Sequence, residues 1–215
     1  MTDTPQKTSG KVVIPEAILS YPHLFEAVAG PEGGEAKYSA TFIFPEGTDL
    51  TALKAAAKAV GEAKWGVKFT EGVRSGKYHW PFRTDVEDKG YPKGSTYIAA
   101  RSKPAPGLVS RYIDPATGKA HIITADEQKP GNVNELYAGC KVRASLSVFA
   151  FDYKSMKFGV SFGLNNIQKL GEGERLDGRR AATDEFEADL SEAPASLDDL
   201  MEWVGARSAN GRPPG

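Results

Sequence analysis

The stretch KVRASLSVFAFDY, residues 141–153, decides the fold, because its side chains alternate between two kinds of surface. Alternate residues of a β-strand project to opposite faces of its sheet. One set is apolar and small to medium in size, as expected inside a barrel: Val142, Ala144, Leu146, Val148 and Ala150. The other set combines cations, hydroxyl groups and aromatic rings: Lys141, Arg143, Ser145, Ser147, Phe149, Phe151 and Tyr153. The stretch therefore predicts a long strand between a core and a basic, aromatic surface.

Shorter patterns on both sides of this strand predict a mainly β protein. Alternation and turn residues predict strands at 11–19, 37–44, 95–103, 108–113, 121–124 and 158–164, with Pro15 at an edge or bulge and a loop at 20–26. An alanine-rich segment at 48–65 predicts the one main helix. Short strands around one helix are typical of an OB-fold-like five-stranded Greek-key barrel with inserted hairpins.

The charges of the chain are unevenly distributed, although its formal net charge is only -1. Residues 184–202 hold eight acidic residues and no basic ones, whereas residues 1–183 hold 25 basic against 20 acidic residues, a net charge of +5. We therefore predict a disordered lead-in at 1–9, an OB-fold domain that binds a polyanion at 10–170, a linker at 171–183 and an acidic, disordered tail at 184–215. A single cysteine and a polar N-terminus indicate an intracellular, reducing setting.

Cations interleaved with aromatic rings recur in three segments, which indicates a surface that stacks bases and binds phosphates without sequence preference. A buried role is the alternative for each single ring, since aromatic residues in β-proteins usually pack in the core. The predicted nucleic-acid-binding residues are Lys77, Trp80, Phe82, Arg83, Tyr91, Lys93, Tyr97, Arg101, Lys103, Lys141, Arg143, Phe149, Phe151, Tyr153 and Lys154.

The acidic tail carries apolar residues between its carboxylates, which favours a functional arm over a merely solvating one. Such an arm could compete with DNA for the basic body or bind replication or recombination proteins. The predicted partner-binding residues are Phe186, Leu197, Leu200 and Trp203.

No catalytic motif, metal-binding spacing or cofactor loop is present in the sequence, so we predict a protein that is not an enzyme and has no cofactor. Two alternatives stay open. Asp85, Glu87 and Asp88 could hold a magnesium ion in a nuclease, and the aromatic face could be a protein interface of a virion or assembly protein. Monomer and dimer are equally compatible with the sequence.

Four stretches resemble a family of single-stranded DNA-binding proteins of tailed phages, formerly catalogued as a domain of unknown function. They are SYPHLFEA (20–27), PFRTDVEDKGYPKGSTYIAARSK (81–103), ELYAGCKVRASLSVFAFD (135–152) and GVSFGLNNIQKL (159–170). The resemblance implies an OB-fold, protection of single-stranded DNA during phage DNA replication or recombination in the host cytoplasm, no catalytic residues and an acidic C-terminal arm. The chain departs from such arms where residues 204–215 follow Trp203 and are weakly basic.

Overall fold

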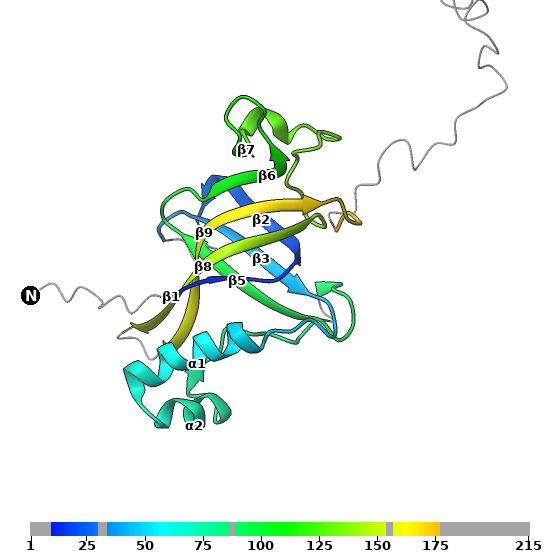
Figure 1. Cartoon of the computed structure of the whole chain (residues 1–215). Coiled ribbons are helices and arrows are strands. Elements are labelled where there is room, and N and C mark those ends of the chain that lie inside the picture. The colour runs from blue at the N-terminus through cyan, green and yellow to red at the C-terminus, as the bar shows by residue number, and fades with distance from the viewer. Residues whose placement is uncertain (1–9, 30–33, 87–88, 154–156, 177–215) are drawn as a thin grey trace, which may run out of the picture. The chain divides into compact units, whose positions relative to one another are not determined.

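The computed structural model describes residues 10–29, 34–86, 89–153 and 157–176, and their strands form one sheet that closes on itself (Figure 1). The strands are β1 (Gly10–Val13), β2 (Ala17–Val28), β3 (Lys37–Phe44), β4 (Tyr78–His79), β5 (Thr96–Ser102), β6 (Gly107–Ile113), β7 (Ala120–Ile122), β8 (Lys141–Tyr153) and β9 (Lys157–Gly171). The helices are α1 (Thr51–Trp65), α2 (Lys68–Arg74) and a 3-10 helix at Ala125–Gln128. None of the described helices is long and apolar enough to cross a membrane.

Five of these strands make the barrel. β2 pairs with β3, β3 with β5, β5 with β9, β9 with β8, and β8 returns to β2. Only the β5–β9 pair in this ring is parallel. This closed order is that of an OB-fold, and the predicted mainly β barrel is confirmed. The β6–β7 hairpin is inserted between β5 and β8, and β6 joins the sheet by pairing in parallel with β9.

The alternation predicted for residues 141–153 is confirmed. Val142, Ala144, Leu146 and Val148 of β8 are all at most 2 % exposed. Their partners on β9 include Phe162 and Ile167, which are also buried. The other parity of β8 faces outward, so this strand separates the core from the surface on which the candidate site lies.

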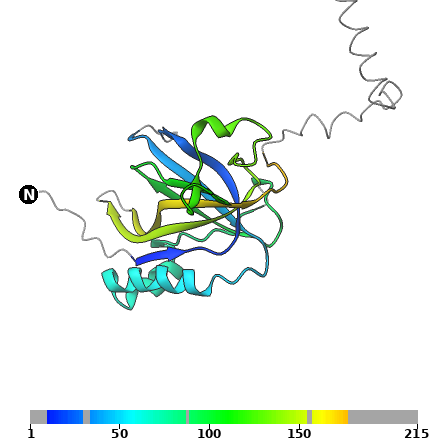
Figure 2. The same cartoon turned by 45° about the horizontal axis from the view of Figure 1, so that its top comes forward.

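Helix α1 packs against β8, β9 and β1 at one end of the barrel (Figures 1 and 2). It buries Leu53, Ala57 and Val60 at helical spacing and ends at Gly66, whose φ of 66° suits glycine. Only one main helix was expected, and α2 is a second one. Its Phe69 is 1 % exposed and stacks on Trp65 with ring centroids 5.6 Å apart.

The N-terminal strands differ from the prediction. The expected strand at 11–19 is broken at Pro15 into β1 and β2, because proline cannot donate a ladder hydrogen bond. The expected loop at 20–26 is wrong, since these residues continue β2 and pair with β3 through Ser20–Thr41 and His23–Ser39. The register shifts between these pairs, and Tyr21 has a φ of 44°. This irregularity is a β-bulge, which disturbs the alternation in the sequence.

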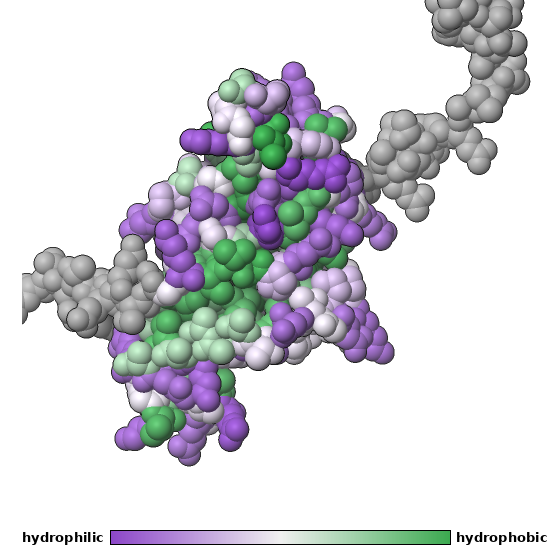
Figure 3. Space-filling view, in the orientation of Figure 1, coloured by the Kyte–Doolittle hydropathy of each residue, from purple (hydrophilic) through white to green (hydrophobic). Residues whose placement is uncertain are grey.

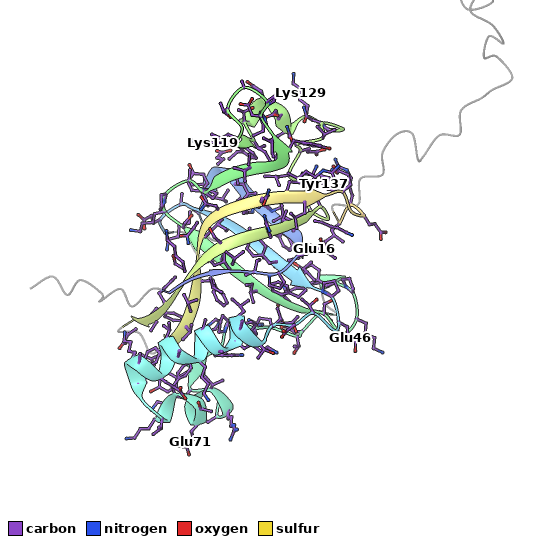
Figure 4. All side chains as sticks on the ribbon, in the orientation of Figure 1. Glu16, Glu46, Glu71, Lys119, Lys129 and Tyr137 are labelled. Carbon is purple, nitrogen blue, oxygen red and sulfur yellow. The ribbon has the colours of Figure 1, made fainter. Side chains whose placement is uncertain are left out.

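After β9, the chain lies against the barrel up to Leu176. The backbone N–H of Leu176 donates to the Ala138 carbonyl at 2.9 Å, and the Tyr137 hydroxyl donates to the Gly173 carbonyl at 2.9 Å. Arg175 and Glu135 form an ion pair with an N–O distance of 2.6 Å. Figure 4 shows Tyr137 beside the end of β9, where these contacts fix residues 171–176 to the domain.

Candidate nucleic-acid interface

The outward side of the β8–β9 pair is the surface that the sequence singled out. We call it the β8–β9 face, and it comprises Arg143, Ser145, Ser147, Phe149 and Phe151 of β8 with Gly163, Asn165, Asn166 and Gln168 of β9. Figure 3, in which β8 and β9 face the viewer, shows an apolar patch over β1 and β8 that continues as a weaker band onto α1. Away from α1, hydrophilic residues border this patch, so apolar and polar residues lie side by side on this surface.

Polar side chains on this face are held by hydrogen bonds between the two strands. Arg143 donates through Nε to the Gln168 amide oxygen at 2.8 Å, which fixes the guanidinium without neutralising its charge. Ser147 and Asn165 hydrogen-bond to each other, and Asn166 donates to the Ser145 hydroxyl at 3.1 Å. These pairs hold one cation and several donors in fixed positions.

The aromatic rings of the face lie at its centre and at the end near β4. Phe149 is half-buried, and its ring lies beside Gly163, where a Cβ atom would be 3.7 Å from the ring carbon Cε1. Phe151 is also half-buried and packs on His79 with ring centroids 5.8 Å apart. Arg101 of β5 is exposed and pairs in register with Gly163. The Arg101 guanidinium and the Phe149 ring therefore flank Gly163, a position at which β9 carries no side chain.

Three of the predicted binding rings are buried instead. Phe82 is 9 % exposed and meets Phe162 of the core edge-on, at 5.7 Å between centroids. Tyr91 and Tyr97 are 8 % and 7 % exposed, and they form a second apolar cluster with residues of β3 and of the 83–95 loop. This loop covers one end of the outer face of β3 and β5, as inserted loops do in β-proteins. These three rings stabilise the fold, and we leave them out of the proposed contact surface.

Arg83 and Asp85 are bound to each other within the same loop. Arg83 donates from Nε and Nη2 to the two Asp85 carboxylate oxygens at 3.0 and 2.9 Å, and the Tyr97 hydroxyl donates to Asp85 at 3.1 Å. The hydrogen bond from Arg83 lowers the pKa of Asp85 below its ordinary value. Both side chains of the pair have their charge compensated, so neither a phosphate contact by Arg83 nor a metal site on Asp85 is favoured by their geometry.

The remaining predicted residues occupy varied positions. Trp80 is half-buried and packs between Phe69 and Phe82, whereas Lys77 and Lys93 are exposed. Two other lysines form exposed ion pairs, Lys103 with Glu35 at 2.8 Å and Lys141 with Glu16 at 3.7 Å. The side chains of Tyr153 and Lys154, the acidic residues Glu87 and Asp88, and the tail residues Phe186, Leu197, Leu200 and Trp203 lie outside the described residues.

Sequence reasoning missed two features of this region. His79 was absent from the predicted site because only the β4–β9 pairing brings it to Phe151. Arg111 and Tyr112 of β6 place a guanidinium 4.9 Å from an exposed ring. Their signal was present in the sequence as a fourth segment with a cation beside an aromatic residue, but the segment 108–113 was considered only as a strand.

Within the described ranges, no three His, Cys, Asp or Glu side chains come together in a way that could hold a metal ion. The single thiol lies in the core, and burial raises the pKa of Cys140 to about 11. It is therefore protonated at neutral pH and lacks the thiolate that a reactive cysteine needs.

Comparisons with known proteins identify the family and support the fold. A family model described as the single-stranded DNA-binding protein of Enterobacter phage Enc34 matches residues 10–197. The solved structure of that phage's protein in complex with ssDNA aligns with a TM-score of 0.52 and 20% identity, over 80% of this chain and 95% of that one.

The solved structure of gp2.5, a single-stranded DNA-binding protein of bacteriophage T7, aligns with a TM-score of 0.51 and 12% identity, over 80% of this chain and 97% of that one. At these identities the structural likeness establishes the fold. No curated protein sequence matches the chain. The family match spans most of the chain and includes all the described strands, so the protein belongs to the family of the Enterobacter phage Enc34 ssDNA-binding protein.

Proposed function

We propose that the protein binds single-stranded DNA without sequence preference, with bases stacked on Phe149 and Phe151 and phosphates bound by Arg101 and Arg143. The observation that carries the proposal is that two half-buried rings and two exposed guanidiniums share the outward side of strands whose other side is the core. Every base has a π-face, so stacking on such rings tolerates any sequence. Family membership supports the same function.

The cations of this surface are suited to phosphate. Arg101 has no ion pair with any described residue, and Arg143 is bonded to the neutral Gln168. Lys103 and Lys141 form exposed ion pairs, and such pairs contribute only about 0–1 kcal/mol. A phosphate can therefore replace Glu35 or Glu16 as the partner of these lysines at little cost. Lys77, Lys93, Lys154 and Tyr153 complete the proposed contact set.

The rest of the proposal follows from the sequence and the family. The protein coats and protects DNA during phage replication or recombination, in the cytoplasm of the bacterial host, and catalyses no reaction. The tail, with eight acidic residues between 184 and 202, competes with DNA for the basic body or binds partner proteins through Phe186, Leu197, Leu200 and Trp203.

A gel-shift experiment with single-stranded DNA, duplex DNA and RNA of one length, at two salt concentrations, tests the function. We expect the single-stranded DNA complex to form most tightly and to weaken steeply with salt, because phosphate contacts release counterions. Equal affinity for duplex DNA, or no shift at low salt, would overturn the proposal. Adding magnesium to the same reactions tests the nuclease alternative through degradation of the labelled strand, and strong self-association without a DNA shift would favour a protein interface.

A further inference from the structure

The β6–β7 hairpin continues the β8–β9 face beyond the barrel. β6 pairs in parallel with β9, so that Val109 lies opposite Gln168, and Gln168 in turn lies opposite Arg143 on β8. The Gln168 amide binds both neighbours, accepting from Arg143 Nε at 2.8 Å and donating to the Ser110 carbonyl at 3.2 Å. The base of the hairpin therefore lies directly beside the cationic end of the face.

The hairpin presents a cation and a ring together at this point. The Arg111 guanidinium lies 4.9 Å from the centroid of the Tyr112 ring and donates to the Tyr112 hydroxyl at 2.9 Å. The Tyr112 side chain is 44% exposed. Both residues line a small pocket that also includes Gly171 and Glu172 at the end of β9. A guanidinium held against an accessible ring is the combination that binds a nucleotide through its phosphate and its base.

Basic residues lie at this end of the domain alongside the acidic Asp114, Asp126 and Glu127. Lys119 and Lys129 project from the hairpin end of the domain (Figure 4). The nearby Glu172 carboxylate lies 2.7 Å from Lys169 Nζ, so its negative charge is compensated.

We propose that single-stranded DNA extends from the β8–β9 face onto the β6–β7 hairpin, where Tyr112 stacks on a base and Arg111 binds a phosphate. This inference rests on the proposed function of the β8–β9 face. β9 has 15 residues, which corresponds to a length of roughly 50 Å at about 3.3 Å per residue. Phe149 pairs with Ser161, and Tyr112 shares a pocket with Gly171, ten residues further along β9, so a DNA strand must span roughly 33 Å to contact both rings.

The experiment compares oligo-dT strands of about 6 and about 20 nucleotides, one near the lower end of the OB-fold range of about 4–16 nucleotides and one above it. Binding to the full chain is measured by tryptophan fluorescence or anisotropy. For the Arg111→Ala/Tyr112→Ala double variant we expect affinity for the long strand to fall about tenfold or more, with a shorter site size and little change for the short strand. If the affinity depends on strand length equally in the wild type and the variant, the proposed extension of the binding surface onto the hairpin is overturned. Failure of the wild type to bind either strand would instead overturn the proposed function.

A matched variant on the same hairpin separates DNA from a second copy of the chain as the occupant. Ile113 and Ile122 are both 69% exposed, and Ile113→Ser/Ile122→Ser removes this apolar pair while Arg111 and Tyr112 stay in place. We expect long-strand affinity within about twofold of wild type. Lost self-association in sedimentation, with a matching loss of long-strand affinity, would identify the hairpin as a protein contact and contradict the proposal. Thermal unfolding of each variant shows whether the fold is retained.

Discussion

Phe149 of β8 lies beside Gly163 of β9, so that the ring borders a stretch of strand without a side chain. A Cβ atom at Gly163 would lie 3.5 Å from the Ser147 Cβ and 3.7 Å from the Phe149 ring carbon Cε1, which is ordinary contact. Glycine within a strand often marks a place where a ligand approaches the backbone closely. Stability therefore does not require glycine at position 163, although the proposed binding of a base there does.

Substitutions at Gly163 test this distinction. Gly163→Ala should fold with nearly unchanged thermal stability, whereas Gly163→Val should keep the fold but weaken oligo-dT binding, because its branched side chain fills the space between Phe149 and Arg101. Gly159 on the same strand is the contrasting control, since a Cβ there would meet the His79 carbonyl oxygen. Gly159→Ala should lower the melting temperature. If Gly163→Val binds DNA like the wild type, the floor of the proposed site lies elsewhere.

The Phe149 ring itself should contribute about 1–3 kcal/mol to binding, the usual effect of removing one ring that stacks on a base. We expect Phe149→Ala to weaken oligo-dT affinity roughly 5- to 150-fold in anisotropy titrations. Phe149→Leu keeps apolar packing without a π-face, and Phe149→Trp keeps both. Stacking predicts that Leu resembles Ala and that Trp resembles the wild type. Equal affinities for Leu and Trp would show that the position contributes only to packing.

Arg101 and Arg83 form a matched pair for testing phosphate binding. Both are exposed on this part of the domain, but Arg83 is held by two hydrogen bonds to Asp85. In a complex with single-stranded DNA, each phosphate that the protein neutralises adds about 0.7 to the steepness with which log affinity falls against log salt. We expect Arg101→Gln to reduce this slope by about 0.7 and Arg83→Gln to leave it unchanged. The reverse result would place the DNA over the 83–95 loop.

Glu127 predicts a specific loss of stability in acid. Its carboxylate accepts hydrogen bonds from the Thr124 backbone N–H at 2.8 Å and from Asn134 at 2.6 Å, and these bonds, with that from Thr124 the strongest cause, lower its pKa from 4.5 to about 2. The unfolded chain therefore binds more protons than the folded one in this range, so the free energy of unfolding falls as pH drops from about 4.5 to about 2.

Glu127→Gln should be less stable than the wild type at pH 7 and should lose less stability across that acid range. Urea unfolding at several pH values measures both effects. Asp126→Asn, an exposed carboxylate in the same 3-10 helix, is the control and should behave like the wild type. Parallel pH curves for the wild type and Glu127→Gln would contradict the prediction.

Deleting residues 184–215 tests competition by the tail. The deletion removes eight acidic and two basic residues, so binding to oligo-dT should strengthen at low salt. The gain should vanish near 1 M salt, where the screening length falls to about 3 Å. Weaker binding by the shortened chain at low salt would contradict the competition model while leaving a role in partner binding to be tested by pull-down.

Alternation made the barrel and the β8–β9 face predictable from the sequence. Along β8 each residue has one clear environment, and burial follows the predicted parity from Val142 to Val148. β9 was expected to end at residue 164, but it continues to Gly171. A register shift opposite Ser145 and Leu146 adds a residue at Asn165–Asn166 and reverses the alternation there. The alternation of buried and exposed residues is thus interrupted at Asn165–Asn166, although β9 itself continues.

Strand alternation could not predict which of the outward-facing aromatic rings are buried. Tyr97 shares the outward parity of Arg101 on β5, but Val86 and Tyr91 of the 83–95 loop pack over it. Arg101 lies further along the same face and is exposed. Whether an outward ring is covered depends on how a loop folds over the sheet, here the 83–95 loop that precedes β5, so strand periodicity alone could not separate Tyr97 from Phe149.

The long strand β9 also has a consequence for how the chain acquires its fold. β4, β5, β6 and β8 all precede β9 in the sequence, and each pairs with it. Until residues 157–171 are available, the edges of these four strands lack that partner, and exposed strand edges are templates for aggregation. Barrel closure is therefore a late, non-local step, which is expected to be slow. A fragment ending before Lys157 should accumulate as an aggregation-prone intermediate, so the segment that organises the proposed binding surface also completes folding.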